Sequence, residues 1–144
     1  MAMRATILFT ILLTLAATAC GQKQTAESLF GDWAGESKCV GSNPYCHDEV
    51  VVYYLTRSKN DAAKINLAAD KIVDGKPDPM GEFDMTFDPE KMTLTAEFTF
   101  KRTGGKGVWL FTIKGDKMDG TLTAFPENEV GRRIHVERKK NDKQ

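Results

Sequence analysis

One short segment of the chain concentrates side chains that can bind a metal or move a proton. His47, Asp48 and Glu49 follow one another directly before an apolar run. Imidazole and carboxylate groups are common zinc ligands, but neighbouring residues of an extended chain point to opposite faces. At most two of the three can share an ion, so His135 would have to supply a third ligand. A metal-dependent enzyme centred on His47, with Asp48 as a second ligand, is one hypothesis; a polar turn leading into a strand is the other interpretation.

Elsewhere the sequence carries no pattern that indicates catalysis. None of the serines lies in the G-x-S-x-G turn of a serine hydrolase. The glycine-rich segment 104–107 lies between two expected strands, whereas a phosphate-binding loop precedes a helix. The formal net charge is +0, which gives no electrostatic footprint for nucleic acid. We therefore expect no enzymatic activity, no cofactor and no nucleic-acid partner.

The first twenty residues indicate export. Arg4 precedes an apolar run over residues 5–17, and Ala17-Thr18-Ala19 leads directly to Cys20. A positive start, an apolar run too short to span a membrane and small residues at the cleavage point are typical of a secretory signal peptide. The segment resembles the lipobox of bacterial lipoproteins, which implies lipid attachment at Cys20. Simple secretion after the same small residues is the alternative.

These features predict where the protein works. Residues 1–19 are expected to be the signal peptide, and residues 20–28 the lipidated cysteine with a polar, flexible tether. The expected location is the bacterial cell envelope, facing the periplasm and held to a membrane by lipid. Gly21 replaces the aspartate that retains enteric lipoproteins at the inner membrane, which favours the outer membrane. A soluble periplasmic or secreted protein is the alternative.

The two remaining cysteines predict a disulfide. Cys39 and Cys46 form an even pair, and exported proteins fold in an oxidising compartment. The residues between them are rich in turn formers, so the bridge would fix a turn. A redox-active pair is the alternative interpretation, but such pairs usually have a two-residue spacing before a helix, and no helical pattern follows here.

Most of the remaining chain alternates between apolar and polar residues. The strongest alternation covers residues 93–100, where Leu94, Ala96, Phe98 and Phe100 are separated by threonines and a glutamate. The other strands are expected near residues 31–37, 50–55, 65–69, 83–87, 109–113, 118–124 and 134–136. Breaks are expected near 74–79, 88–91, 103–107 and 114–116. The alanine-rich segment 61–71 is also compatible with a helix.

About eight sequential strands joined by short turns predict an all-β domain over residues 29–140, followed by a polar tail at 141–144. The two economical arrangements are an antiparallel up-and-down barrel and a β-sandwich. We favour the barrel because closure leaves no exposed strand edge. Eight strands also enclose a lumen that side chains can fill or that can hold one small ligand.

The start of this domain carries a family resemblance. Gly31-Asp32-Trp33 is similar to the G-x-W start of lipocalin-like small barrels, in which the tryptophan plugs one end. The hairpin at 115–122 looks like the late hairpins of the same class, and segment 39–54 resembles uncharacterised bacterial exported proteins. The resemblance implies a lipocalin-like barrel without naming a ligand. It also implies an arginine packed over Trp33, for which Arg132 and Arg133 are the candidates.

Three functional hypotheses follow. The leading one is a non-enzymatic, lipid-anchored envelope protein whose barrel binds a small apolar ligand, with Trp33, Tyr54, Phe98 and Trp109 as expected lumen-facing residues. The alternative is a protein-binding module of the envelope, such as an assembly factor or a lysozyme-inhibitor-like protein. The third is the metal-dependent enzyme centred on His47.

Overall fold

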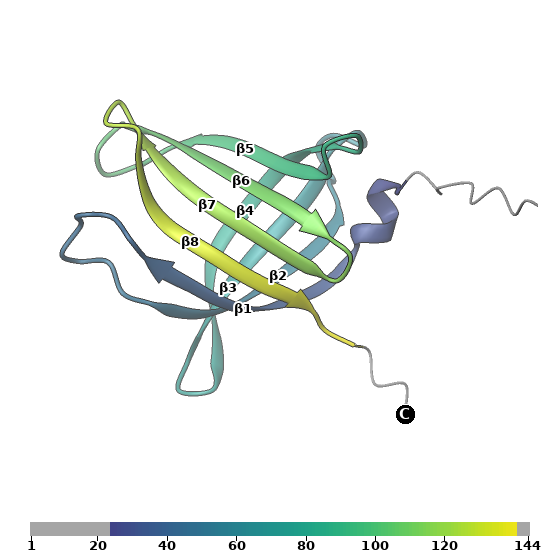
Figure 1. Cartoon of the computed structure of the whole chain (residues 1–144), viewed down its shortest axis with the longest axis horizontal. Helices are drawn as coiled ribbons and strands as arrows, with labels where there is room; N and C mark the ends of the chain where they lie inside the picture. Colours follow the sequence, from purple (N-terminus) through teal and green to yellow (C-terminus); the bar gives the residue numbers. More distant parts are fainter. Residues whose placement is uncertain (1–23, 141–144) are drawn as a thin grey trace, which may run out of the picture.

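Each strand of the domain pairs with the strand that follows it in the sequence, and the last strand returns to pair with the first (Figure 1). The computed structural model describes residues 24–140. After a short 3₁₀ turn, η1, the chain forms eight antiparallel strands that close into a barrel. The elements are η1 (Ala26–Leu29), β1 (Gly31–Cys39), β2 (Glu49–Arg57), β3 (Ile65–Val73), β4 (Lys76–Asp88), β5 (Thr93–Thr99), β6 (Lys106–Lys114), β7 (Lys117–Phe125) and β8 (Glu129–Arg138).

This architecture confirms the predicted all-β up-and-down barrel, and the β-sandwich alternative is wrong. The fold is compatible with the lipocalin-like class. The predicted signal peptide at 1–19, Cys20 and the tail at 141–144 lie outside the described residues. The last residues of the predicted tether form η1, in which Leu29 is fully buried. Within the described range, no helix has the length and apolar character needed to cross a membrane.

Alternation of side chains explains why these segments are strands. In β3, Ile65, Leu67 and Ala69 are buried and the residues between them are partly exposed. Leu67 pairs with Leu55 of β2, so the buried residues of β3 lie in register with those of the neighbouring strand. A helix over the same residues could not form this pairing. The helical alternative for 61–71 is therefore wrong, because packing outweighs the weak local preference of alanine.

The expected break at 74–79 is much shorter in the structure. Only Asp74 and Gly75, both with positive φ, make the turn, and β4 begins at Lys76. Pro77 and Pro79 therefore lie within a strand. They are tolerated because β4 pairs with β5 only over its last three residues, which leaves the first part of β4 as an edge. This β3–β4 hairpin projects from the barrel at the bottom of Figure 1.

One end of the barrel is closed by η1 and Trp33. The indole Nε1 of Trp33 donates a hydrogen bond to the carbonyl of Leu29 at 3.0 Å. The Arg138 guanidinium lies over the indole ring, 4.4 Å from its centroid. It also donates to the carbonyls of Phe30 at 2.8 Å and Ser28 at 2.7 Å. One side chain thus ties η1, the tryptophan and the last strand together.

The arginine over Trp33 is therefore Arg138, and the expectation of Arg132 or Arg133 is wrong. Strand register gives the reason, because Trp33 pairs directly with Arg138 across β1 and β8. Arg132 pairs with Cys39 near the opposite end of the barrel. Arg133 is exposed, since it alternates with the buried positions of β8.

We expect Arg138→Met to lower the free energy of unfolding by about 2–4 kcal/mol, because it removes a cation–π contact and three charge-assisted hydrogen bonds, to the carbonyls of Phe30 and Ser28 and to the Asp116 carboxylate. Urea denaturation followed by circular dichroism measures the change. Arg133→Met is the matched control, and its effect should stay within about 0.5 kcal/mol. Equal effects of the two substitutions would contradict the role given to Arg138.

Candidate ligand-binding cavity

The half of the barrel away from η1 contains a cavity of about 230 Å³. Its wall is mainly aromatic and aliphatic, with three polar side chains. The lining residues are Ser37, Glu49, Tyr53, Leu67, Ala69, Met80, Phe83, Met85, Phe98, Phe100, Trp109, Phe111, Leu122 and Arg132. Met80 is the extra residue of a β-bulge, because Ala69 pairs with Gly81 and Asp70 with Pro79. An apolar cavity with few polar groups is the usual form of a small-molecule site.

Two glycines allow the large rings to lie against the wall of the barrel. The Phe98 ring covers Gly107 on the neighbouring strand, and the Phe111 ring covers Gly120. A Cβ atom at either glycine would collide with the ring. The rings therefore occupy space next to the backbone. At the closed end, by contrast, Trp33, Leu55 and Met118 fill the interior.

The aromatic rings of the cavity form a continuous set of contacts. Trp109 stacks on Phe111 with centroids 5.7 Å apart, and Phe83 lies 5.2 Å from Phe98. Phe98 also meets Phe100 edge-on at 5.0 Å. These distances fall in the favourable range for aromatic pairs, which fixes the ring positions before any ligand binds. The wall therefore presents both ring faces and ring edges to an occupant.

Two of these rings carry a polar group, namely the Trp109 indole and the Tyr53 phenol. The Trp109 Nε1–H is buried and has no acceptor among residues 24–140. Burial raises the pKa of the Tyr53 phenol well above its usual value, although the nearby charge of Arg132 opposes the shift. Tyr53 therefore remains a neutral phenol at physiological pH. Trp109 and Tyr53 thus line the cavity with their rings, and the Trp109 N–H is itself enclosed by neighbouring atoms.

A charged cluster lies at the polar part of the cavity. Arg132 Nη1 contacts Glu49 Oε2 at 3.1 Å and donates to Ser37 Oγ at 3.1 Å. Ser37 is only 2% exposed, and the side chains of Arg132 and Glu49 are 18% and 20% exposed. The three residues come from β1, β2 and β8, where Ser37 pairs with Glu49. Removing such a pair from water is costly, and here the partly buried pair lies in the lining of the cavity.

Of the four residues expected to face the lumen, two line the cavity and two do not. Phe98 and Trp109 line the cavity. Trp33 is buried at the closed end, and Tyr54 is half-buried outside the cavity, where its neighbour Tyr53 takes the expected place. Residues 50–55 are uniformly apolar or aromatic, so alternation alone could not decide which tyrosine faces inward.

Sequence reasoning missed the charged cluster. A signal for it exists, because Arg132 lies at the same parity as the buried Ile134 and Val136, and Glu49 at the same parity as Val51 and Tyr53. Extending the period of two by one step on each strand would have placed both charges inside.

The expected metal ligands are not brought together. Asp48 Oδ1 accepts a hydrogen bond from the backbone N–H of Cys39 at 2.8 Å, and Glu49 pairs with Arg132. His135 lies on β8, where its Nδ1 is 2.7 Å from Asp119 of β7. Residues 24–140 contain no group of three or more histidine, cysteine, aspartate or glutamate side chains placed to hold a metal. In the described part of the chain, His47, Asp48 and His135 therefore do not come together as one set of ligands.

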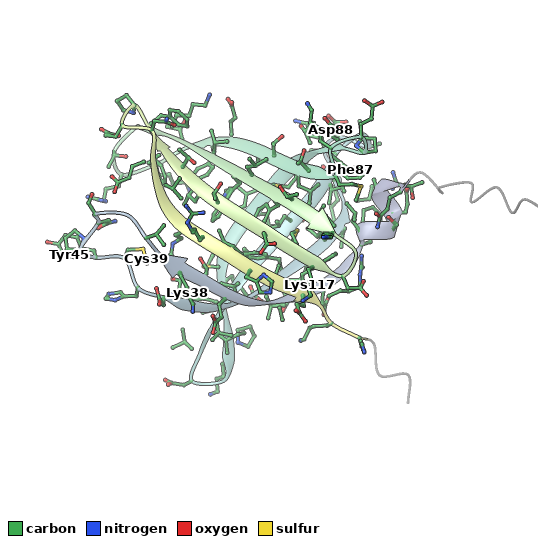
Figure 2. The ribbon with its side chains drawn as sticks, viewed as in Figure 1. Lys38, Cys39, Tyr45, Phe87, Asp88 and Lys117 are labelled. Carbon is green, nitrogen blue, oxygen red and sulfur yellow. A yellow bond between two sulfur atoms is a disulfide. The ribbon has the colours of Figure 1, made fainter. Side chains whose placement is uncertain are left out.

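The predicted disulfide is confirmed, and it closes the loop between β1 and β2. Cys39 and Cys46 are bonded, with their Cα atoms 5.9 Å apart. The loop is also held to the start of β8, since Ser42 donates from its backbone and its hydroxyl to Glu129. These hydrogen bonds lower the pKa of Glu129, the backbone bond most strongly. Figure 2 shows Tyr45 at the outer tip of this loop, where it is 84% exposed.

Comparison with known proteins adds no assignment. A scan against protein-family models finds no match to the chain, and a search of curated proteins finds no significant match. The cavity is therefore interpreted through its own chemistry. That chemistry consists of aromatic and aliphatic surface, the Tyr53 phenol, and the Arg132–Glu49 pair beside Ser37.

Replacing both Cys39 and Cys46 by serine should lower the free energy of unfolding by about 2.5 kcal/mol, the chain-entropy estimate for so short a loop. The measurement is urea denaturation of the folded domain. Reduction of the wild type should produce a similar loss, and the double variant should not respond to reductant. An unchanged midpoint in the double variant would show that the bridge does not stabilise the fold.

Proposed function

We propose that this protein is a non-enzymatic binding protein that holds a small, mainly apolar molecule inside its barrel. The observation that carries this proposal is the aromatic cavity of about 230 Å³. An apolar cavity of about 150 Å³ is enough to bind benzene, whereas drug-sized ligands occupy about 300–1,000 Å³. The size therefore favours a ligand with one aromatic ring and a short substituent. The cavity supports this function over a protein-binding module, which would not need one.

The buried N–H of Trp109 predicts a second property of the ligand. Leaving a buried donor without a partner costs about 1–3 kcal/mol, and the Trp109 Nε1–H has no acceptor among the described residues. The N–H has almost no accessible surface in this structure, so a ligand with an oxygen acceptor would recover part of this cost once the indole turns toward it. We therefore propose an apolar ligand with at least one acceptor atom over a purely hydrocarbon one.

Tryptophan fluorescence tests this proposal directly, because the chain has only two tryptophans and only Trp109 lines the cavity. We expect 4-bromoanisole, a single ring with an ether oxygen and a heavy-atom quencher, to quench fluorescence saturably. The response should persist in Trp33→Phe and be lost in Trp109→Phe. Ala69→Leu keeps both tryptophans but adds bulk to the cavity wall, so it should also abolish saturable quenching. Non-saturable quenching in the wild type, or full quenching in Ala69→Leu, would refute cavity binding.

We further propose that the protein is a bacterial lipoprotein anchored through Cys20. The support is the sequence pattern before Cys20 together with the position of η1. Residue 20 lies four positions before the first described residue, and four residues span at most roughly 14 Å. A nine-residue strand is about 30 Å long. An anchor at Cys20 would therefore hold the closed end near the membrane and leave the cavity end facing away from it.

Cys20→Ser should move the full-length protein from the membrane fraction to the soluble fraction of an expressing bacterium, because it removes the lipidated thiol. Fractionation followed by immunoblotting measures the distribution. The Cys39→Ser/Cys46→Ser double variant is the control, and it should remain with the membranes. Retention of Cys20→Ser in the membrane fraction would contradict the anchor.

A further inference from the structure

The Arg132–Glu49 pair has binding capacity that the protein does not use. The two contacts that the structure shows for Arg132 both employ Nη1. Its Nε and Nη2 donate to no residue of the described range, and Glu49 Oε1 accepts from none. Both side chains line the cavity. The pair therefore presents donors and an acceptor to whatever occupies the space beside it.

Charge decides which chemical group this pair can recognise. A ligand carboxylate would be attracted to Arg132 and repelled by Glu49, whose carboxylate lies 3.1 Å from the guanidinium. An ammonium group would experience the reverse. At such short separation the two effects largely cancel. A neutral hydroxyl has no such conflict, since it can donate to the carboxylate and accept from the guanidinium at the same time.

We propose that Arg132 and Glu49 bind the hydroxyl group of a small, neutral aromatic alcohol whose ring lies among Phe83, Phe98 and Trp109. This inference rests on the proposed cavity binding and names the ligand class. Glu49 accepts the hydroxyl hydrogen, and Arg132 donates to the hydroxyl oxygen. Ser37 holds Arg132 in place, because its Oγ accepts a hydrogen bond from Nη1. The aromatic wall supplies contact area, and the pair supplies selectivity for the polar end.

Four molecules of the same size test the selectivity of the pair. They are 4-methoxybenzyl alcohol, 4-ethylanisole, 4-methoxybenzoate and 4-methoxybenzylammonium, which share a methoxyphenyl ring and differ at one end. In titration calorimetry with the wild type, the alcohol should bind about three- to tenfold more tightly than 4-ethylanisole, the gain expected from net hydrogen bonding. Both ions should bind more weakly than the alcohol.

Charge-removing variants should then change the ranking. Glu49→Gln leaves Arg132 uncompensated, so 4-methoxybenzoate should gain at least about tenfold relative to the alcohol, as expected for a charge-assisted hydrogen bond. Arg132→Gln should favour the ammonium in the same way. Glu97→Gln is the matched control, because Glu97 forms an ion pair with Lys106 at 2.7 Å on the outside of the barrel. It should leave the ranking unchanged.

The outcomes separate this inference from the proposed function. If none of the four molecules binds to the wild type, cavity binding itself fails. If 4-ethylanisole binds as tightly as the alcohol, or if Glu49→Gln binds the alcohol without gaining affinity for the benzoate, cavity binding stands and the role of the pair is overturned. Should Arg132→Gln fail to fold, the wild-type ranking and the isosteric Glu49→Gln variant still decide the matter.

Discussion

The contact between Arg138 and Trp33 determines how the interior of this barrel is divided. The guanidinium covers the indole and binds two carbonyl groups around η1. One end of the barrel is therefore sealed by residues from the N-terminal and the C-terminal parts of the domain. Sealing one end allows the other to remain open without exposing the whole core to water. The apolar side chains near Trp33 fill the closed end, while those near Phe98 line the cavity.

The same strand register also places the polar part of the cavity. On β8 the residues that face inward recur every second position, from Arg138 through Val136 and Ile134 to Arg132. Arg138 is thus used for closure and Arg132 for the cavity, although both are arginines of one strand face. Their partners differ, since Arg138 meets two backbone carbonyls, an indole ring and the exposed Asp116 carboxylate. Arg132 meets the partly buried Glu49 and the buried Ser37. Two identical side chains therefore have different roles because the residues around them differ.

Residue patterns predicted the fold more completely than the site. Alternation over 93–100 and similar segments specifies strands, and their number with short turns favours an antiparallel barrel. Local patterns cannot reveal which residues pair across a closed sheet, and so Arg138 was missed as the partner of Trp33. The uniformly apolar segment 50–55 hid the inward position of Tyr53 in the same way. Phe98 and Trp109, which stand in clearly alternating segments, do line the cavity.

Pairing of β1 with β8 has a kinetic consequence. The hydrogen bond from Arg138 to Phe30 joins residues 108 positions apart, and the barrel cannot close before both strands are present. Chains dominated by such distant pairings fold slowly, in roughly milliseconds to seconds. A chain that crosses a membrane from its N-terminus would release β1 long before β8. Until the last strand arrives, the edges of the growing sheet would be unprotected, which exposes the incomplete barrel to edge-to-edge association.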